Sequence, residues 1–254
     1  MSKVNDYAGF SELYDILVPV KEGYDTEFVK YLHYDIFQKH HVQTVLDCAC
    51  GTGHQSIGLA KWGYDVTSSD FSIEMVNILK AKSDIYNVNL NIAHVDWGHL
   101  SGQFGGEKFD AVLCGGNCLY HYSDSEKSKY LTEMCKVLKT GGIAYIDYEF
   151  WDEEFREIGR ELMSQRFKLY DHVEYEGRNI VSASIYEHEG RKQILTVYFF
   201  IEHNKTIKVK NYVFTGYAFS TKELFELARK AGFSSMMNVK RPGIWNLNAM
   251  LAIK

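Results

Sequence analysis

Residues 44–53 read Thr-Val-Leu-Asp-Cys-Ala-Cys-Gly-Thr-Gly, and this stretch decides the fold. An apolar, β-prone segment runs into two glycines one residue apart, Gly51 and Gly53, and residues 54–62 then have the pattern of a helix. Glycines at a strand-to-helix turn let the backbone approach a ligand closely, because no Cβ stands in the way. The helix that follows points its free amide groups and the positive end of its dipole at the turn. A ligand site is therefore expected where the first strand ends.

A second strand, expected over residues 64–69, leads into Asp70, which stands 17 residues after Gly53. In nucleotide-binding α/β folds, the acid at this place accepts hydrogen bonds from ribose hydroxyls. A dinucleotide site also needs the third glycine of G-x-G-x-x-G, and Ser56 occupies that position here. The pattern therefore disfavours an NAD-dependent oxidoreductase.

Strand and helix signals alternate through the first 150 residues, which predicts a parallel sheet. The apolar spacing predicts helices over 72–83 and 125–139 and strands over 90–94, 109–114 and 143–148. Residues 140–142, Thr-Gly-Gly, are expected to stop the second of these helices.

Helix signals vanish between residues 166 and 217. Strands separated by short turns are expected over residues 172–176, 180–188, 194–202 and 207–213, which is the spacing of a hairpin meander. We expect the turn at 189–191 to be exchangeable without harm. A helix over 221–231 and two strands close the chain. Because no linker or repeat interrupts the sequence, residues 1–254 are expected to form one domain.

Composition limits the function classes. The chain has 254 residues, 46% of them hydrophobic, and a formal net charge of −5, so it lacks the basic balance typical of nucleic-acid partners. No apolar run is long enough for a membrane helix, and the first 15 residues do not have the pattern of a signal peptide. Five cysteines without a C-x-x-C pair favour a reducing compartment, the cytoplasm, and disfavour a metal site.

The first turn resembles that of a known enzyme family. Asp47, Ala49, Gly51 and Gly53 stand at alternate positions. They resemble motif I of class I S-adenosylmethionine-dependent methyltransferases, D/E-x-G-x-G-x-G, with Ala49 in place of the first glycine. The resemblance implies a Rossmann-like, seven-stranded, mostly parallel sheet with helices on both faces. Residues 156–213 would then form an antiparallel β insertion that acts as a lid over the methyl acceptor.

Two further stretches make the resemblance more specific. Residues 114–121, Cys-Gly-Gly-Asn-Cys-Leu-Tyr-His, look like the G-N-S-x-x-H loop of glycine N-methyltransferases. Residues 10–24 resemble the N-terminus of amino-sugar N,N-dimethyltransferases. The matches cover most of residues 10–150 and the segment 228–233.

The resemblance implies S-adenosyl-L-methionine as the cofactor, S-adenosyl-L-homocysteine as its product, and no metal. It places an acid or amide on the adenine amino group, here Asp96, with Trp97 beside the ring, although Trp97 would also suit a surface aromatic cluster. The residues expected to bind the cofactor are Tyr14, Asp47, Ala49, Gly51, Gly53, Asp70, Phe71, Asp96, Trp97, Gly115 and Asn117.

Three residues are candidates for the chemistry: His121, Tyr14 and Glu149. A histidine can act as a general base near neutral pH or simply order its loop. Glycine N-methyltransferases read D-x-R-N after the fifth strand, and the resemblance assigns that arginine to the carboxylate of the amino acid. This chain has Glu149 at the position of the arginine. An acid there would repel glycine and attract an amine, unless it points to solvent or pairs with Arg156 or Arg160.

The sequence therefore predicts an enzyme that moves a methyl group to the nitrogen of a small-molecule amine, such as an amino sugar, by in-line displacement. A monomer or homodimer is expected, with neither nucleic-acid nor membrane partners. Two alternatives stay open. One is an O-methyltransferase of a small hydroxylated metabolite with His121 as base. The other is a non-catalytic protein that only binds S-adenosylmethionine.

Overall fold

The computed structural model describes residues 9–20, 22–149, 167–189, 191–243 and 247–254. Its larger sheet has seven strands in a mixed arrangement. In spatial order they are β10 (Ser235–Arg241), β11 (Leu247–Ile253), β5 (Leu138–Tyr148), β4 (Phe109–Cys114), β1 (Thr44–Asp47), β2 (Asp65–Asp70) and β3 (Asn91–His94). The neighbouring strands β5 and β4, β4 and β1, β1 and β2, and β2 and β3 are parallel to each other. Strand β11 is antiparallel to both of its neighbours, β10 and β5. The expected Rossmann-like architecture is confirmed.

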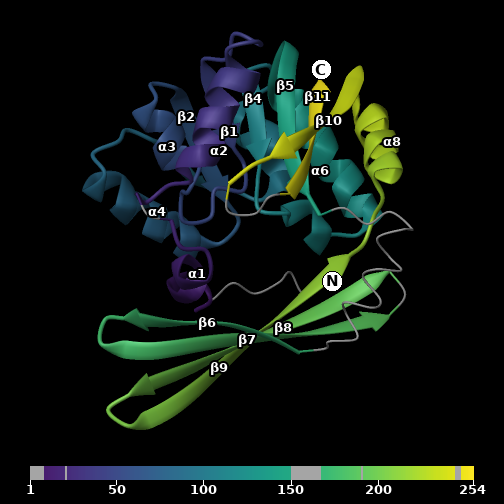
Figure 1. Cartoon of the computed structure of the whole chain (residues 1–254). Coiled ribbons are helices and arrows are strands. Elements are labelled where there is room, and N and C mark those ends of the chain that lie inside the picture. The colour runs from purple at the N-terminus through teal and green to yellow at the C-terminus, as the bar shows by residue number, and fades with distance from the viewer. Residues whose placement is uncertain (1–8, 21, 150–166, 190, 244–246) are drawn as a thin grey trace.

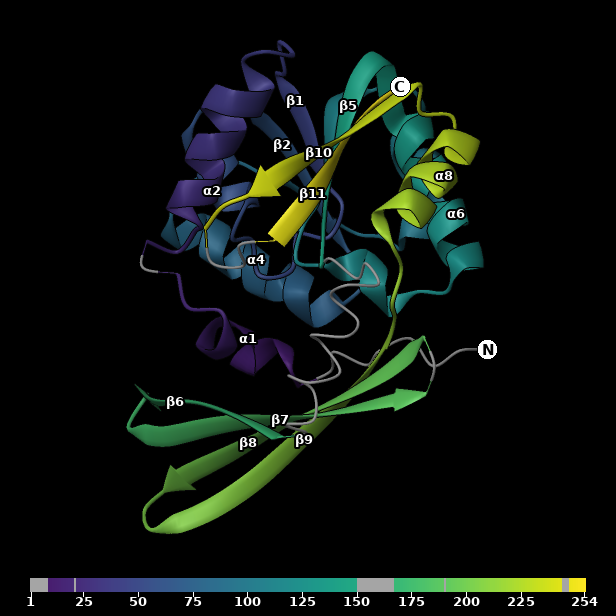
Figure 2. The ribbon, with the colours of Figure 1, turned by 45° about the vertical axis from the view of Figure 1, so that its right-hand side comes forward.

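Helices cover both faces of this sheet (Figures 1 and 2). On one face α2 (Thr26–Tyr31), the π-helix Leu32–Phe37 and α3 (Ser56–Lys61) bury apolar side chains against the central strands. On the other face lie α5 (Leu100–Phe104), α6 (Asp124–Val137) and α8 (Thr221–Ala231). The other helices within the described residues are α1 (Ser11–Leu17), α4 (Ile73–Ile85) and two short 3-10 turns, Trp97–His99 and Cys118–His121. Among the described residues, no helix is long and apolar enough to cross a membrane.

One predicted helix stop is wrong. The helix before β5 ends at Val137, and residues 140–142 belong to β5. The parallel register between β4 and β5 shifts between Phe109 and Ala111, and Gly141 adopts a φ of +77° in this irregular stretch. Backbone bonds between Lys254 and the two glycines hold the segment in place. The glycines therefore serve a bulged strand rather than a helix end.

A second sheet of four antiparallel strands confirms the expected meander. Its strands are β6 (Phe167–Tyr175), β7 (Arg178–Glu189), β8 (Lys192–His203) and β9 (Thr206–Tyr217), paired in that order. Residues 156–166, where the insertion was expected to begin, lie outside the described residues, and the last strand extends to Tyr217 rather than to residue 213. Helix α1 lies between the second sheet and the larger one (Figure 1). Its Leu13 packs with apolar side chains of β8 and β9.

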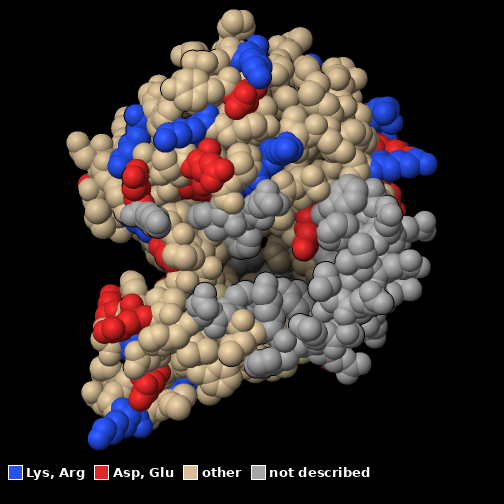
Figure 3. Space-filling model, viewed as in Figure 1, with Lys and Arg blue, Asp and Glu red and all other residues tan. Residues whose placement is uncertain are grey.

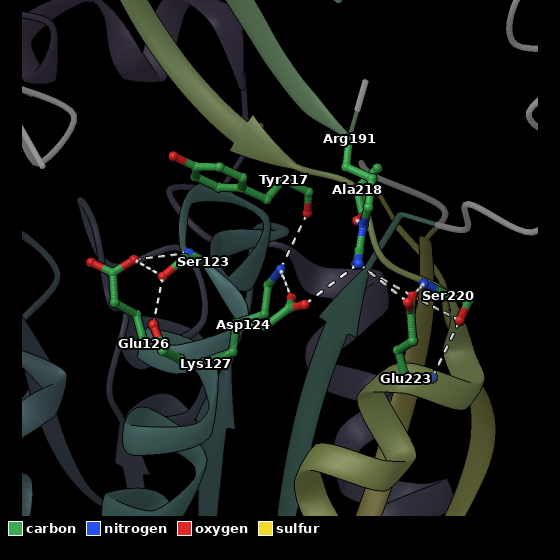
Figure 4. Close-up of polar contacts among 10 residues, drawn as sticks. Ser123, Asp124, Glu126, Lys127, Arg191, Tyr217, Ala218, Ser220 and Glu223 are labelled. Atoms are coloured by element: carbon green, nitrogen blue, oxygen red, sulfur yellow. Dashed lines mark hydrogen bonds and ion pairs between the residues drawn. The ribbon is translucent and has the colours of Figure 1, made fainter. Parts of the chain in front are cut away.

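An ionic junction joins the second sheet to α6 and α8 (Figure 4). The guanidinium of Arg191 donates to the carbonyl of Ala218 at 2.9 Å and pairs with Asp124 at 3.5 Å and with Glu223 at 3.3 Å. The buried ammonium of Lys127 donates to the carbonyl of Tyr217 at 3.2 Å. The expectation that turn 189–191 is freely exchangeable therefore needs correction at Arg191, because this side chain ties the second sheet to two helices.

Candidate active site

A cavity of about 280 Å³ lies where β1, β2 and β4 end. Its wall is formed by the turns that follow these strands, by α1 and by side chains of β8 and β9. In the space-filling view the surface is hollowed between the layers of the larger sheet and the second sheet (Figure 3). The carboxyl ends of parallel strands are the usual ligand site of such folds.

The turn after β1 provides backbone and open space. Ala49 and Gly51 line the cavity, and Gly51 has a φ of +51°. A Cβ added to Gly51 would meet no atom nearer than 4.0 Å, where the ring of Tyr14 lies. A side chain at this position would therefore project into the space of the cavity, and glycine keeps that space available to a ligand.

Two members of the expected motif do not reach the cavity. A Cβ on Gly53 would come within 2.2 Å of the Leu79 side chain, so this glycine is needed for close packing against α4. The carboxylate of Asp47 is fully buried behind the turn and accepts the hydroxyl of Ser56 at 2.7 Å. Burial raises the pKa of Asp47 to about 7.

Asp70 lies in the wall of the cavity, as the spacing indicates. Its two carboxylate oxygens accept the backbone amides of Gly51 and Ser72, each at 2.9 Å. These bonds fix the carboxylate between the first turn and the start of α4. Each oxygen keeps a second lone pair that can accept a ligand hydroxyl. Burial raises the pKa of Asp70 above its usual value.

Only some of the residues expected around the adenine border the cavity. Phe71 and Trp97 line the cavity, and the buried indole of Trp97 donates to the carbonyl of Cys48. Asp96 does not line it: its carboxylate caps the short helix after β3 by accepting the amide of Gly98 at 2.7 Å. In this arrangement the apolar rings, rather than the acid, border the cavity.

The loop after β4 is held by a buried carboxylate. Asp147, at the end of β5, accepts the amides of Gly116 at 3.0 Å and Asn117 at 2.6 Å. The buried guanidinium of Arg241 pairs with Asp147 at 3.2 Å. Gly116 lines the cavity, whereas Asn117 turns its side-chain oxygen to the amide of Glu149 at 3.0 Å.

Glu149 is an exposed residue outside the cavity wall. The structure therefore does not bring it to the other two residues expected to serve the chemistry, His121 and Tyr14, which both line the cavity.

Tyr14 is placed over the two glycine turns by α1. Its ring lies 4.0 Å from a Cβ built on Gly51, and its hydroxyl lies 3.9 Å from one built on Gly116. Burial, together with nearby thiol and carboxylate groups, raises the pKa of Tyr14 far above its usual value, so the phenol is neutral.

The next residue on α1, Asp15, fastens this helix. Its carboxylate accepts the hydroxyl of Thr52 at 2.6 Å and the ring nitrogen of His54 at 2.9 Å, and it pairs with Lys82 at 2.5 Å. Although burial acts in the opposite direction, these bonds hold the pKa of Asp15 well below its usual value.

His121 borders the cavity from the loop after β4. Its Nδ1 lies 3.2 Å from the carbonyl of Thr215 on β9. A carbonyl only accepts, so Nδ1 carries the proton and Nε2 of the neutral ring is an acceptor. Burial lowers the pKa of His121 to about 4, despite the opposing bond to Thr215. The imidazole is therefore uncharged at neutral pH.

Of the residues expected to bind the cofactor, seven line the cavity: Tyr14, Ala49, Gly51, Asp70, Phe71, Trp97 and Gly115. Asp47, Gly53, Asp96 and Asn117 do not. The contacts of Asp15 were not predicted from the sequence, although this residue directly follows Tyr14. Those of Arg241, which no sequence pattern marks, were not predicted either.

Comparisons with known proteins agree with this geometry. A family model described as a methyltransferase domain matches residues 45–142. The chain is 32% identical over 191 residues to a glycine/sarcosine N-methyltransferase of Aphanothece halophytica, covering 73% of this chain and 67% of the relative. It is 33% identical to the glycine N-methyltransferase of Oryctolagus cuniculus but spans only 44% of that protein.

Solved structures share the fold over nearly the whole chain. The S-adenosylmethionine-bound CalS10, an amino pentose methyltransferase from Micromonospora echinaspora, has a TM-score of 0.75 at 17% identity, covering 95% of this chain and 96% of that one. The chain therefore belongs to the class I S-adenosylmethionine-dependent methyltransferases. It is an enzyme that transfers the methyl group of this cofactor.

The residues around the cavity fit that cofactor. The glycine turn leaves room for a ligand beside Gly51, and Asp70 offers acceptors for hydroxyl groups. The rings of Phe71 and Trp97 give an apolar border. The carboxylate of Asp70, in the wall of the cavity, favours a positively charged ligand, of which a sulfonium is one.

Proposed function

We propose that the protein transfers the methyl group of S-adenosylmethionine to the nitrogen of a small-molecule amine. The observation that carries the proposal is the sign of the charge around the cavity. The carboxylate of Asp70 lies in the wall, whereas the charge of Asp147, whose carboxylate is 3.5 Å from a Cβ built on Gly115, is balanced by Arg241. A nitrogen acceptor becomes positively charged as the methyl group arrives, so the field of Asp70 stabilises the product-like state.

When bound, the cofactor supplies a methyl group activated by the positive charge on its sulfur. We assign Asp70 to its ribose hydroxyls, Phe71 and Trp97 to its adenine, and Gly51 and Tyr14 to its methionine part. The protein then has to hold the acceptor nitrogen in line with the methyl group. Such positioning accounts for about 7–11 kcal/mol of barrier lowering in well-oriented reactions.

His121 suits an amine better than a hydroxyl. The neutral ring offers Nε2 as an acceptor for an N–H of the substrate and so orients its lone pair. With a pKa of about 4, the imidazole is a weak base at neutral pH. A hydroxyl acceptor needs its proton removed, whereas a neutral amine reacts directly, so this pKa disfavours the O-methyl alternative. The exposed position of Glu149 gives it no part in our proposal.

The relatives support nitrogen as the acceptor atom, because the proteins of Aphanothece halophytica, Actinopolyspora halophila and Oryctolagus cuniculus to which the chain is similar are named as N-methyltransferases. Two structural neighbours are named as a sugar N-methyltransferase and an amino pentose methyltransferase. These names span different acceptors, so the identity of the amine has to come from the cavity of this chain.

The test is a methyl-transfer assay with a panel of amines and phenols, read by release of S-adenosylhomocysteine and by the position of the new methyl group. We expect N-methylated products from the wild type. Asp70→Asn should weaken cofactor binding at least about tenfold in calorimetry, since charge-assisted bonds contribute about 1.5–3 kcal/mol each. Methylation confined to phenol oxygens would refute the proposal. Unchanged cofactor affinity in the variant would refute the role of Asp70.

A further inference from the structure

The wall of the cavity is apolar on the side away from the turns that contain Gly51 and Gly116. Leu195 and Val197 come from β8, Phe214 from β9, and Phe10 and Leu17 from the ends of α1. The rings of Phe10 and Phe214 meet edge to face with their centroids 4.9 Å apart. Phe10, Val197 and Phe214 are each 5% exposed or less. Three separate elements thus present hydrocarbon to the same space.

The charged part of the cavity wall lies beside the turn that contains Gly51. Among the described residues that line the cavity there is no Lys or Arg side chain, and Asp70 beside the first turn is the carboxylate. The buried guanidinium of Arg241, behind the loop after β4, is engaged by Asp25 at 2.9 Å and by Asp147 at 3.2 Å. A substrate carboxylate placed against Phe10 and Val197 would lose its hydration, and none of the described residues that line the cavity offers it a counter-ion.

Hydroxyl groups would also be poorly matched there. Polar side chains near the apolar wall include His121 and Tyr122, from the loop after β4, and Tyr14, whose ring centroid lies 6.0 Å from that of Phe10. The Nδ1 of His121 is already bonded to Thr215. A sugar ring with several hydroxyls would leave most of them without partners against the hydrocarbon of β8 and β9, and each such group is costly to bury.

We propose, on the basis of the function proposed above, that the acceptor is an amine carried on an apolar body, aromatic or aliphatic, without a carboxylate. Its body lies against Phe10, Val197 and Phe214, and its nitrogen lies next to His121. The apolar surroundings favour the neutral amine over the ammonium, which is the form that reacts. The nitrogen lone pair forms the new N–C bond as the C–S bond breaks. The electron pair of that bond stays on sulfur, and the ammonium product releases one proton to water.

The substrate test compares four amines at saturating S-adenosylmethionine: 2-phenylethylamine, phenylalanine, glycine and glucosamine. Phenylalanine is the matched control, because it adds only a carboxylate to 2-phenylethylamine. We expect kcat/KM for 2-phenylethylamine to exceed that for glycine and glucosamine by about 10- to 100-fold, the range given by burial of one phenyl group. It should exceed that for phenylalanine at least about tenfold, because the carboxylate would lose its hydration against the apolar wall. Calorimetric titration of the protein loaded with S-adenosylhomocysteine should rank the amines in the same order.

A variant pair locates the preference in the wall. Val197→Thr replaces a methyl group by a hydroxyl of similar size, and should raise KM for 2-phenylethylamine about tenfold while leaving cofactor affinity unchanged. Val213→Thr is the control, because Val213 is 53% exposed on β9 of the same sheet. It should leave both constants unchanged.

The outcomes separate two failures. Glycine, phenylalanine or glucosamine as the better substrate, or an unchanged KM in Val197→Thr, would overturn the apolar acceptor and leave N-methylation standing. Tyramine, which carries both an amine and a phenol, tests the proposed function. A methyl group found on its phenol oxygen would overturn that function, and this inference with it.

Discussion

The contacts of Asp15 hold helix α1 in place over the turns that contain Gly51 and Gly116. Asp15→Asn is nearly isosteric and keeps one oxygen that can accept from Thr52 or His54. The new amide group, however, is a donor and cannot accept from Lys82, whose ammonium lies 2.5 Å from the native carboxylate. The variant therefore removes the ion pair and leaves the helix sequence otherwise intact.

The magnitude follows from the geometry. A charge-assisted hydrogen bond contributes about 1.5–3 kcal/mol. The carboxylate of Asp15 is 37% exposed, so solvent screening reduces the loss to about 1–2 kcal/mol. Helix α1 has only seven residues, and its other contacts include apolar packing and a 4.0 Å pair between Glu12 and Lys210, so this loss should act mainly on its closure. Since 1.4 kcal/mol corresponds to a factor of ten, we expect cofactor dissociation to become about 5- to 30-fold faster.

Stopped-flow dissociation and equilibrium titration with S-adenosylhomocysteine measure this directly. Glu12→Gln is the matched control, because Glu12 lies on the same helix, is 74% exposed and meets Lys210 only at 4.0 Å. The ion pair should also be lost in acid. The pKa of Asp15 in the folded protein is depressed, so the stabilisation that its carboxylate provides is present at neutral pH. That stabilisation disappears as the pH falls through the depressed pKa. An unchanged dissociation rate in Asp15→Asn would refute the inference that Asp15 holds α1 over the bound cofactor.

Three other predictions follow from particular side chains. Gly51→Val should abolish cofactor binding in calorimetry, because the valine side chain would enter the cavity. The φ of +51° at this position should also cost the variant about 1–2 kcal/mol of stability. Retained cofactor affinity would contradict the prediction. The folded pKa of His121, about 4, lies below its unfolded value, so stability should rise with pH between about 4 and 6.5, and His121→Phe should flatten that rise in chemical denaturation. Arg191→Ala should lower the midpoint of thermal unfolding by a few degrees, about 1 kcal/mol, whereas Arg178→Ala, at the other end of the same sheet, should not; equal effects would contradict a special role for the junction.

The sequence by itself determined the features that depend on local chemistry. A strand running into Gly51, and Asp70 at the end of the next strand, lie within one βαβ unit, whose geometry is set by short-range sterics and hydrogen bonds. The alternation of strands and helices and the meander after residue 166 are likewise local periodicities, and the structure confirms both. These features suffice for the fold and for the class of cofactor site.

Only the tertiary structure decided which of the candidate residues meet. Gly53 belongs to the same motif as Gly51, yet packing against Leu79 gives it a structural role. Asp96 and Glu149 stand at the expected positions in the chain, but a helix cap uses the first and the second is exposed. The apolar wall joins side chains from positions 10, 197 and 214, which no local pattern connects. Burial and charge at a point in space sum over distant segments, so the acceptor end of the site follows only from their packing.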